Sequence, residues 1–128
     1  MGKFEWPIKV QPAHIDGMGH VNNVVYVQWV QDAAAAHWNT VATPEWQNQY
    51  AWVVIRHEID YKSAALPGDE LVAHTWVHDF EGVRSTRVVQ IIRKKDEKLL
   101  AEARTTWCLL ATHTNRPTRI PEELKSIF

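Results

Sequence analysis

The stretch of sequence that decides the fold is residues 14–39, HIDGMGHVNNVVYVQWVQDAAAAHWN. Its first part holds a carboxylate, two histidines, two glycines and two asparagines, a composition that favours an irregular loop. Its second part is a long apolar run, which Asn22 or Asn23 can cap through a side-chain oxygen. The sequence therefore predicts a loop followed by a helix that runs to about Asn39.

The predicted helix has a broad apolar face, because its apolar residues recur at intervals of three and four positions. One stripe consists of Val25, Trp29, Ala33 and Ala36. The residues beside it are Tyr26, Val30, Ala34 and His37. Four consecutive alanines make part of the helix slender, so another element can pack close to it. We expect a sheet to wrap around this helix.

Most of the remaining chain has the pattern of β-strands. Alternating apolar residues, or β-branched and aromatic clusters, predict strands at residues 4–10, 52–61, 71–79, 84–93 and 99–111. A helical turn is expected at residues 44–48 and a short helix at 121–125, each opened by a proline. Because no helix crosses between the later strands, the sheet should be antiparallel. We expect an α+β domain over residues 1–128, in the order β-α-β-β-β-β, with a five-stranded antiparallel sheet and a short C-terminal helix.

Composition excludes several classes of protein. The formal net charge of −1 lacks the strongly basic footprint that nucleic-acid binding needs. Cys108 is the only cysteine, which excludes an intrachain disulfide and fits a reduced compartment. No window approaches the roughly 20 apolar residues that span a bilayer, and the first residues lack an apolar signal core. We expect a cytoplasmic protein that binds neither nucleic acid nor membrane. Seven tryptophans in one small domain also favour a subunit contact and hence a homo-oligomer.

Three other features suggest chemistry but have simpler explanations. His14, Asp16 and His20 are residue types that bind zinc, yet they lack a recognisable ligand spacing, so no metal is expected. Cys108 lies within a predicted strand, where cysteine commonly serves as a small buried apolar residue. Asp32, about two turns along the helix, is a solvated residue, a partner for an arginine across an interface, or a support for Asp16.

The pattern D-x-x-G-H-V-N-N-x-x-Y at residues 16–26, after a strand and ahead of a long helix, resembles the hot-dog-fold thioesterases. It is most similar to the 4-hydroxybenzoyl-CoA thioesterase group. Tyr61 followed by PGDEL at residues 67–71 is similar to the second recurring segment of that family. The plant-type acyl-carrier-protein thioesterases also have a histidine where His20 stands, but their asparagine two residues earlier is Met18 here, which argues against their mechanism and substrates.

This resemblance implies a central helix enclosed by the sheet, and two protomers that join their sheets into a homodimer or a homotetramer with shared active sites. It implies an acyl-CoA substrate and no cofactor. Asp16 matches the catalytic carboxylate of the benzoyl-CoA group. Asn23 matches the position whose backbone N–H polarises the thioester carbonyl.

The residues themselves are consistent with thioester hydrolysis. Asp16 can attack the carbonyl carbon or act as a general base toward water, and the sequence does not choose between the two. Unpaired N–H groups at the helix start, near Asn23 and Val24, can hold the oxyanion. Gly19, like Gly17, lets the backbone pass close to a substrate. His20 orients Asp16 or binds substrate, or else is a loop histidine that packs against the helix.

Other candidate contacts lie further from the loop in sequence. Tyr26, one turn into the helix, is either a core residue or part of the pocket floor. A CoA substrate needs cations for its phosphates, and the resemblance favours Arg84, Ser85 and Arg87 as the nucleotide-binding segment. The alternative for these three residues is an ordinary solvated strand end.

Three functions are compatible with these observations. The first is an acyl-CoA thioesterase that uses Asp16, His20 and Asn23. The second is a non-catalytic hot-dog module that binds acyl-CoA. The third is a hydratase or dehydratase of acyl thioesters, which would also use an acid and a histidine.

Overall fold

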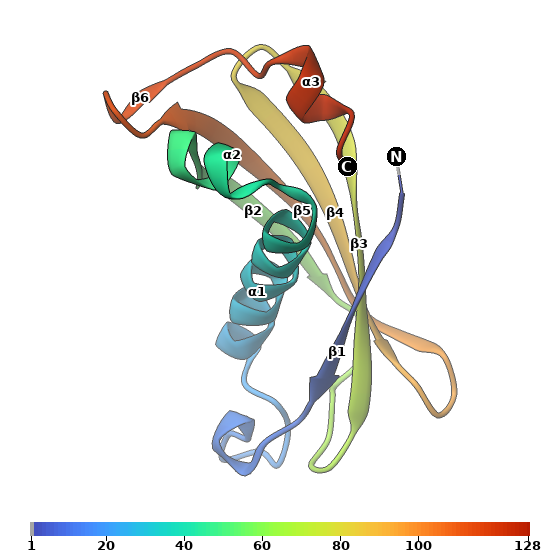
Figure 1. Ribbon diagram of the computed structural model, residues 1–128. Coiled ribbons are helices and arrows are strands. Elements are labelled where there is room, and N and C mark those ends of the chain that lie inside the picture. Colours follow the sequence, from blue (N-terminus) through green and yellow to red (C-terminus); the bar gives the residue numbers. More distant parts are fainter. Residues whose placement is uncertain (1) are drawn as a thin grey trace.

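A curled antiparallel sheet wraps around one long helix in the computed structural model, which describes residues 2–128 (Figure 1). The sheet order is β1-β3-β4-β5-β2, with β6 pairing on β5. The elements are β1 (Phe4–Lys9), the 3-10 helix η1 (Pro12–His14), α1 (Asn23–Val41), α2 (Pro44–Gln49), β2 (Tyr50–Tyr61), β3 (Glu70–Glu81), β4 (Arg84–Arg93), β5 (Lys98–Ala111), β6 (Arg116–Pro117) and α3 (Glu122–Lys125). This architecture confirms the predicted α+β hot-dog fold.

The structure adds two short elements, η1 and β6, and moves some boundaries. The two-residue strand β6 makes the sheet six-stranded rather than five-stranded. β2 begins two residues earlier than predicted, because Tyr50 pairs with Ala111 of β5. Local sequence pattern does not show either feature, since both depend on pairing with a distant strand.

A side chain caps the start of α1, and a change to extended backbone at Ala42 ends it. The Asn22 side chain accepts a hydrogen bond from the Val24 N–H at 3.0 Å, so Asn22 is the cap and Asn23 is the first helical residue. At the other end, the Ala42 N–H donates to the Trp38 carbonyl. Thr43 then caps α2, whose first residue is a proline.

The core lies between α1 and the concave face of the sheet. The buried residues of α1 are Tyr26, Trp29, Val30, Ala33, Ala34 and His37. The predicted stripe is therefore displaced slightly, since Val25 and Ala36 are only half-buried. Small residues such as Ala73, Ala101 and Ala103 face α1 from the sheet and let the helix approach closely.

The two edges of the sheet differ. β1 has six residues and contains Pro7, features that protect an edge strand from further pairing. β2 has twelve residues without a proline, and only one of its sides pairs, with β5. Its exposed residues include Val53 and Ile55, which are 40% and 46% exposed. The long, apolar edge of β2 is thus open in the single chain.

Between residues 2 and 128, no helix is both long and apolar enough to cross a membrane.

Candidate active site

The predicted loop holds Asp16 in a fixed position through its own backbone. Asp16 Oδ1 accepts hydrogen bonds from the Met18 N–H at 2.8 Å and the His20 N–H at 3.4 Å. The Asp16 N–H in turn donates to the His20 carbonyl at 2.8 Å. Gly19 closes this turn with a positive φ of 78°, a conformation that glycine adopts without strain. Among the described residues no hydrogen bond uses Asp16 Oδ2, which is left for a substrate or a water.

The start of α1 provides one available amide. The Val24 N–H is already bonded to the Asn22 side chain, and the Val25 N–H donates to the Asn22 carbonyl. The Asn23 N–H has no hydrogen-bond partner in the part of the chain that the structure describes. Of the two amides predicted to hold an oxyanion, the structure therefore leaves Asn23 available and shows that the Val24 N–H is occupied by the cap. The Val24 side chain is 72% exposed.

Asp16 and Asn23 line the same pocket, whose volume is about 260 Å³. Its other lining residues are Met18, His20, Val21, Tyr26, Tyr61, Lys62, Ser63 and Ala64. Tyr26 is buried, and its hydroxyl accepts a hydrogen bond from the Ala65 N–H at 2.8 Å. Burial raises the pKa of Tyr26 above its ordinary value, so the phenol stays neutral. The pocket therefore joins a carboxylate, a free amide donor and a neutral phenol.

Tyr61, Lys62 and Ser63 are pocket residues that the sequence interpretation did not include in the site. The Tyr61 hydroxyl donates to the Asn23 carbonyl at 3.2 Å and so connects the end of β2 to the start of α1. Tyr61 opens the second recurring segment of the family pattern. That segment was the sequence feature that could have indicated these residues, but it does not by itself predict that they lie beside Asp16.

His20 contacts Asp16 through its main chain. Its N–H donates to the carboxylate, and its carbonyl accepts from the Asp16 N–H. No hydrogen bond of the His20 side chain is found within residues 2–128, and this side chain is exposed at the pocket. Gly19 shapes the loop and is not among the pocket-lining residues.

The structure separates the predicted nucleotide-binding residues from this pocket and from one another. Arg84 is exposed, whereas Ser85 and Arg87 are buried on the face of β4 that is turned toward α1. Alternation along a strand explains the split, because adjacent residues point to opposite faces. Arg93, Lys94 and Lys95 lie at the other end of β4, about 30 Å from Arg84 along a ten-residue strand. The basic residues of β4 and of the turn after it therefore do not form one surface.

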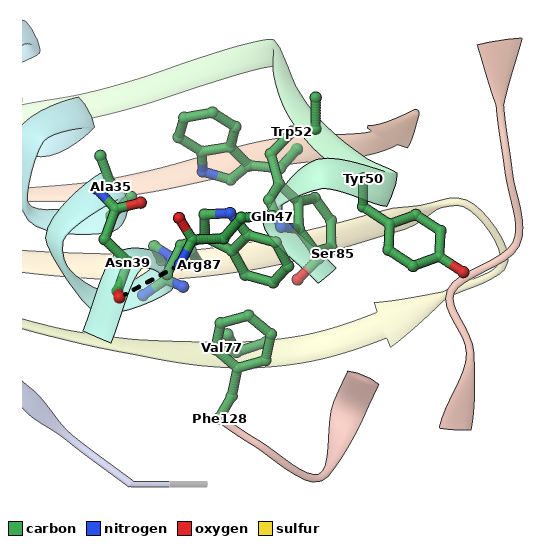
Figure 2. A pocket seen from close by; sticks show the side chains of 13 residues that line it. Ala35, Asn39, Gln47, Tyr50, Trp52, Val77, Ser85, Arg87 and Phe128 are labelled. Carbon is green, nitrogen blue, oxygen red and sulfur yellow. Dashed lines mark hydrogen bonds between the residues drawn. The ribbon is translucent and has the colours of Figure 1, made fainter. Parts of the chain in front are cut away.

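Ser85 and Arg87 instead line a second cavity of about 350 Å³ near the C-terminal half of α1 (Figure 2). Its walls are mostly aromatic and apolar. The lining residues are Ala34, Ala35, Trp38, Asn39, Gln47, Tyr50, Ala51, Trp52, Val77, Ser85, Arg87, Trp107 and Phe128. Sequence analysis did not predict this cavity, because its walls come from six elements and from the segment after α3.

Among the described residues that line this cavity, Arg87 alone has a charged side chain, and it is 5% exposed. Its Nη1 donates to His37 Nδ1 at 2.9 Å and to Thr75 Oγ1 at 3.1 Å. Burial lowers the pKa of His37 to about 4, and the neighbouring guanidinium adds to the effect. Burial also lowers the pKa of Arg87 to about 10, which leaves the guanidinium charged at neutral pH. His37 is thus a neutral acceptor for a buried cation.

No group of three or more histidine, cysteine or acidic side chains suited to hold a metal ion occurs within residues 2–128. Cys108 is buried in β5. Asp32 accepts a hydrogen bond from Gln28 at 2.8 Å on the same helix.

Comparison with known proteins places the chain in a family. The thioesterase-like superfamily matches residues 10–128. The long-chain acyl-CoA thioesterase FadM of Escherichia coli is 26% identical over 121 residues, which cover 92% of this chain and 91% of that protein.

Solved structures share the fold at low identity. The crystal structure of YbaW, a probable thioesterase from Escherichia coli, has a TM-score of 0.85 and 22% identity, over 95% of this chain and 93% of that one. Slr0204 from Synechocystis, a 1,4-dihydroxy-2-naphthoyl-CoA thioesterase, has a TM-score of 0.84 and 20% identity, over 98% and 95% of the two chains. With the match over residues 10–128, these likenesses make the chain a member of the thioesterase-like superfamily, built on the hot-dog fold.

Proposed function

We propose that the protein is an acyl-CoA thioesterase that hydrolyses an acyl-CoA to a free acid and CoA, with no cofactor. The observation that carries this proposal is the pairing of Asp16 and the free Asn23 N–H in one pocket. Two backbone N–H groups hold Asp16 Oδ1 in place and leave Oδ2 for the reaction. The family membership and the likeness to FadM support the same activity.

Two routes remain open for Asp16. As a nucleophile, Asp16 Oδ2 forms a bond to the thioester carbonyl carbon, CoA leaves as its thiolate, and water hydrolyses the resulting anhydride. As a general base, Asp16 takes a proton from water while the hydroxide attacks the same carbon and CoA leaves. In both routes the thiolate is finally protonated from solvent. Recovery of ¹⁸O in the Asp16 carboxylate after turnover in labelled water would identify the nucleophilic route.

The oxyanion that forms on the carbonyl carbon is stabilised by the start of α1. The Asn23 N–H is a free donor at the positive end of the helix dipole, so it strengthens its interaction as negative charge develops. The exposed His20 ring contacts the acyl-CoA, and the loop turn that it shares with Asp16 orients the carboxylate. Tyr26 forms the floor, and the positive φ of Gly19 closes the turn that holds Asp16.

A second copy of the chain completes the site. The open edge of β2 can pair with the same strand of another copy, which would bury its unpaired backbone groups. In an antiparallel pair, the Tyr61 end of β2 faces the opposite end of the partner strand. The partner therefore adds a wall beside the pocket that holds Asp16. Of the predicted phosphate contacts, Arg84 is exposed, whereas Ser85 and Arg87 line the second cavity.

The test is thiol release from a panel of acyl-CoAs by the wild-type protein and by the Asp16→Asn variant. The variant should remain folded and lose roughly 10²–10⁴-fold in kcat, the usual contribution of a positioned acid or base. Asp32→Asn is the matched control, because Asp32 pairs with Gln28 on α1, and it should retain activity. Equal rates for wild type and Asp16→Asn would remove Asp16 from the reaction. Acyl-CoA binding by wild type without thiol release would favour a non-catalytic binding module, and hydration of an enoyl-CoA a hydratase.

A further inference from the structure

The aromatic cavity beside α1 contains a buried cation with no counter-ion. Arg87 makes no ion pair within the described residues, and both partners of its Nη1, His37 and Thr75, are neutral. A buried charge is normally paired, because removing it from water without compensation is costly. The site is therefore electrostatically incomplete.

Part of the guanidinium is left for a ligand. No hydrogen bond in the described part of the chain uses the Nε or Nη2 atom of Arg87, and neither atom is a fully buried unpaired donor. These two nitrogens form one edge of the planar guanidinium, which matches the two oxygens of a carboxylate. Figure 2 shows Arg87 among the side chains that line the cavity.

The walls supply two more unpaired donors. The indole N–H groups of Trp52 and Trp107 are buried and have no hydrogen-bond partner among residues 2–128. Both residues line the cavity. A buried donor without a partner is uncommon and destabilises the fold unless an acceptor reaches it. Arg87 and the two unpaired indoles therefore belong to the wall of one cavity.

The shape of the cavity suits a flat ligand. Trp38 and Trp52 meet edge to face with ring centroids 6.0 Å apart, and Phe128 stacks with Trp38 at 6.1 Å. Phe128 also lies 5.5 Å from the Arg87 guanidinium carbon. Such aromatic walls favour a ligand with an aromatic ring, which can stack on the faces of the wall rings or contact their edges. A volume of about 350 Å³ lies within the range of cavities that hold small molecules.

We propose that this cavity is a binding site for a free aromatic carboxylate, with the carboxylate on Arg87 and the ring packed against Trp38, Trp52 and Phe128. The site is distinct in the single chain from the pocket of Asp16, since the two lie near opposite ends of α1. It does not depend on thioester hydrolysis.

The experiment compares two ligands of the same shape, 2-naphthoate and its neutral amide, by titration calorimetry on the wild-type protein. Naphthoate should bind on the order of tenfold to a hundredfold more tightly, as expected for hydrogen bonds to a charged donor. Arg87→Met keeps an apolar stem and should abolish this difference. Asp16→Asn should leave naphthoate binding unchanged, so a failure of the thioesterase proposal would not affect this result.

A second measurement needs no change at Arg87. In ¹⁵N-labelled wild-type protein, naphthoate should shift the indole N–H signals of Trp52 and Trp107, which Trp52→Phe and Trp107→Phe identify by the loss of one signal each. The indole signal of Trp6, which does not line the cavity, is the internal control. Equal affinity for naphthoate and its amide, or indole signals that do not move at saturation, would overturn the proposal.

Discussion

At the residue scale, the difference between Asn22 and Asn23 controls which backbone amide is free. Sequence analysis predicts that one of the two asparagines caps the helix, and the structure assigns this role to Asn22. The cap takes the Val24 N–H and leaves the Asn23 N–H without a partner among the described residues. A single hydrogen bond thus decides which donor can meet a substrate.

Asn23→Pro is a direct test of that donor. Asn23 is the first helical residue, where proline is well tolerated, and Asn22 before it has the extended backbone (φ −61°, ψ 136°) that a residue preceding proline requires. The variant should keep α1 and lose about 10²–10³-fold in kcat, because an oxyanion donor is removed. Measurement of thiol release, with circular dichroism to verify the helix, gives both values.

Asn23→Ala is the matched control, because it deletes the side chain and keeps the N–H. It should retain most of the wild-type rate. If the alanine and proline variants lose the same activity, the amide is not the donor and the side chain of Asn23 is responsible.

Residue types alone could not assign every role. The carboxylate loop and the aromatic at Tyr26 were accessible from the motif, because their spacing is local. Ser85 and Arg87 are buried in the single chain, which residue type alone does not predict, since burial depends on which face of β4 turns toward α1. Tyr61 lies 35 residues after Tyr26 in the sequence, and β2 brings it beside the start of α1. Its hydrogen bond to Asn23 cannot be predicted from the sequence.

At the scale of elements, α1 docks on the sheet through a polar contact as well as an apolar one. His37 of α1 accepts a hydrogen bond from Arg87 of β4, and its ring stacks on Phe4 of β1 with centroids 4.9 Å apart. Protonation of His37 would remove the acceptor and place two cations side by side. The docking of the helix is therefore sensitive to acid.

The expected consequence is a loss of stability as the pH falls. The pKa of His37 is about 4 in the folded protein and near 6.5 when unfolded, so the unfolded state binds the proton first. The contribution of His37 is complete above pH 6.5 and declines toward pH 4. Between pH 6.5 and pH 5 this one group should cost about 2 kcal/mol of unfolding free energy. Urea unfolding at pH 7 and pH 5 measures it.

His37→Gln keeps an acceptor for Arg87 and cannot take up a proton, so its unfolding free energy should fall less between pH 7 and pH 5 than that of wild type. His113→Gln changes an exposed histidine of the turn after β5 and should reproduce the wild-type pH dependence. An identical decline in wild type and His37→Gln would show that other groups cause the acid sensitivity.

The elements themselves were largely predictable, because their periodicity is strong. α1 and the five long strands appear where the apolar patterns place them, with ends that shift by one or two residues. β6 was missed because a two-residue strand has no periodicity, and only its pairing with Leu110 and Ala111 defines it. The helix extends past Asn39 to Val41 since the stop signal is the change of backbone at Ala42.

At the scale of the whole molecule, the difference between the two edges of the sheet favours assembly of two copies through β2. β2 exposes Val53 and Ile55 beside twelve residues of half-paired backbone, whereas β1 is short and contains a proline. An open edge of this length in a single chain favours strand pairing with another copy. The sequence predicts an oligomer from its tryptophans, and we propose this edge as its interface.

Val53→Lys combined with Ile55→Lys tests the edge. Both side chains are already exposed, so the folded single chain should tolerate lysine, but two copies would bring like charges together. Sedimentation equilibrium should show a dimer or tetramer for wild type and a single chain for the double variant. Leu66→Lys, which changes an exposed apolar residue in a loop away from this edge, should leave the mass unchanged. A wild type that sediments as a single chain would contradict the proposed assembly.

The extended backbone at Asn22 and the first-turn position of Asn23 have an evolutionary consequence. Proline at position 23 fits the helix and removes the free N–H, so one substitution would separate recognition from turnover. Under the proposed function, a descendant of this chain with that change would keep its cavities and its fold and lose hydrolysis. Among natural sequences, proline at this position would therefore mark a pseudoenzyme, a former catalyst retained for what it holds.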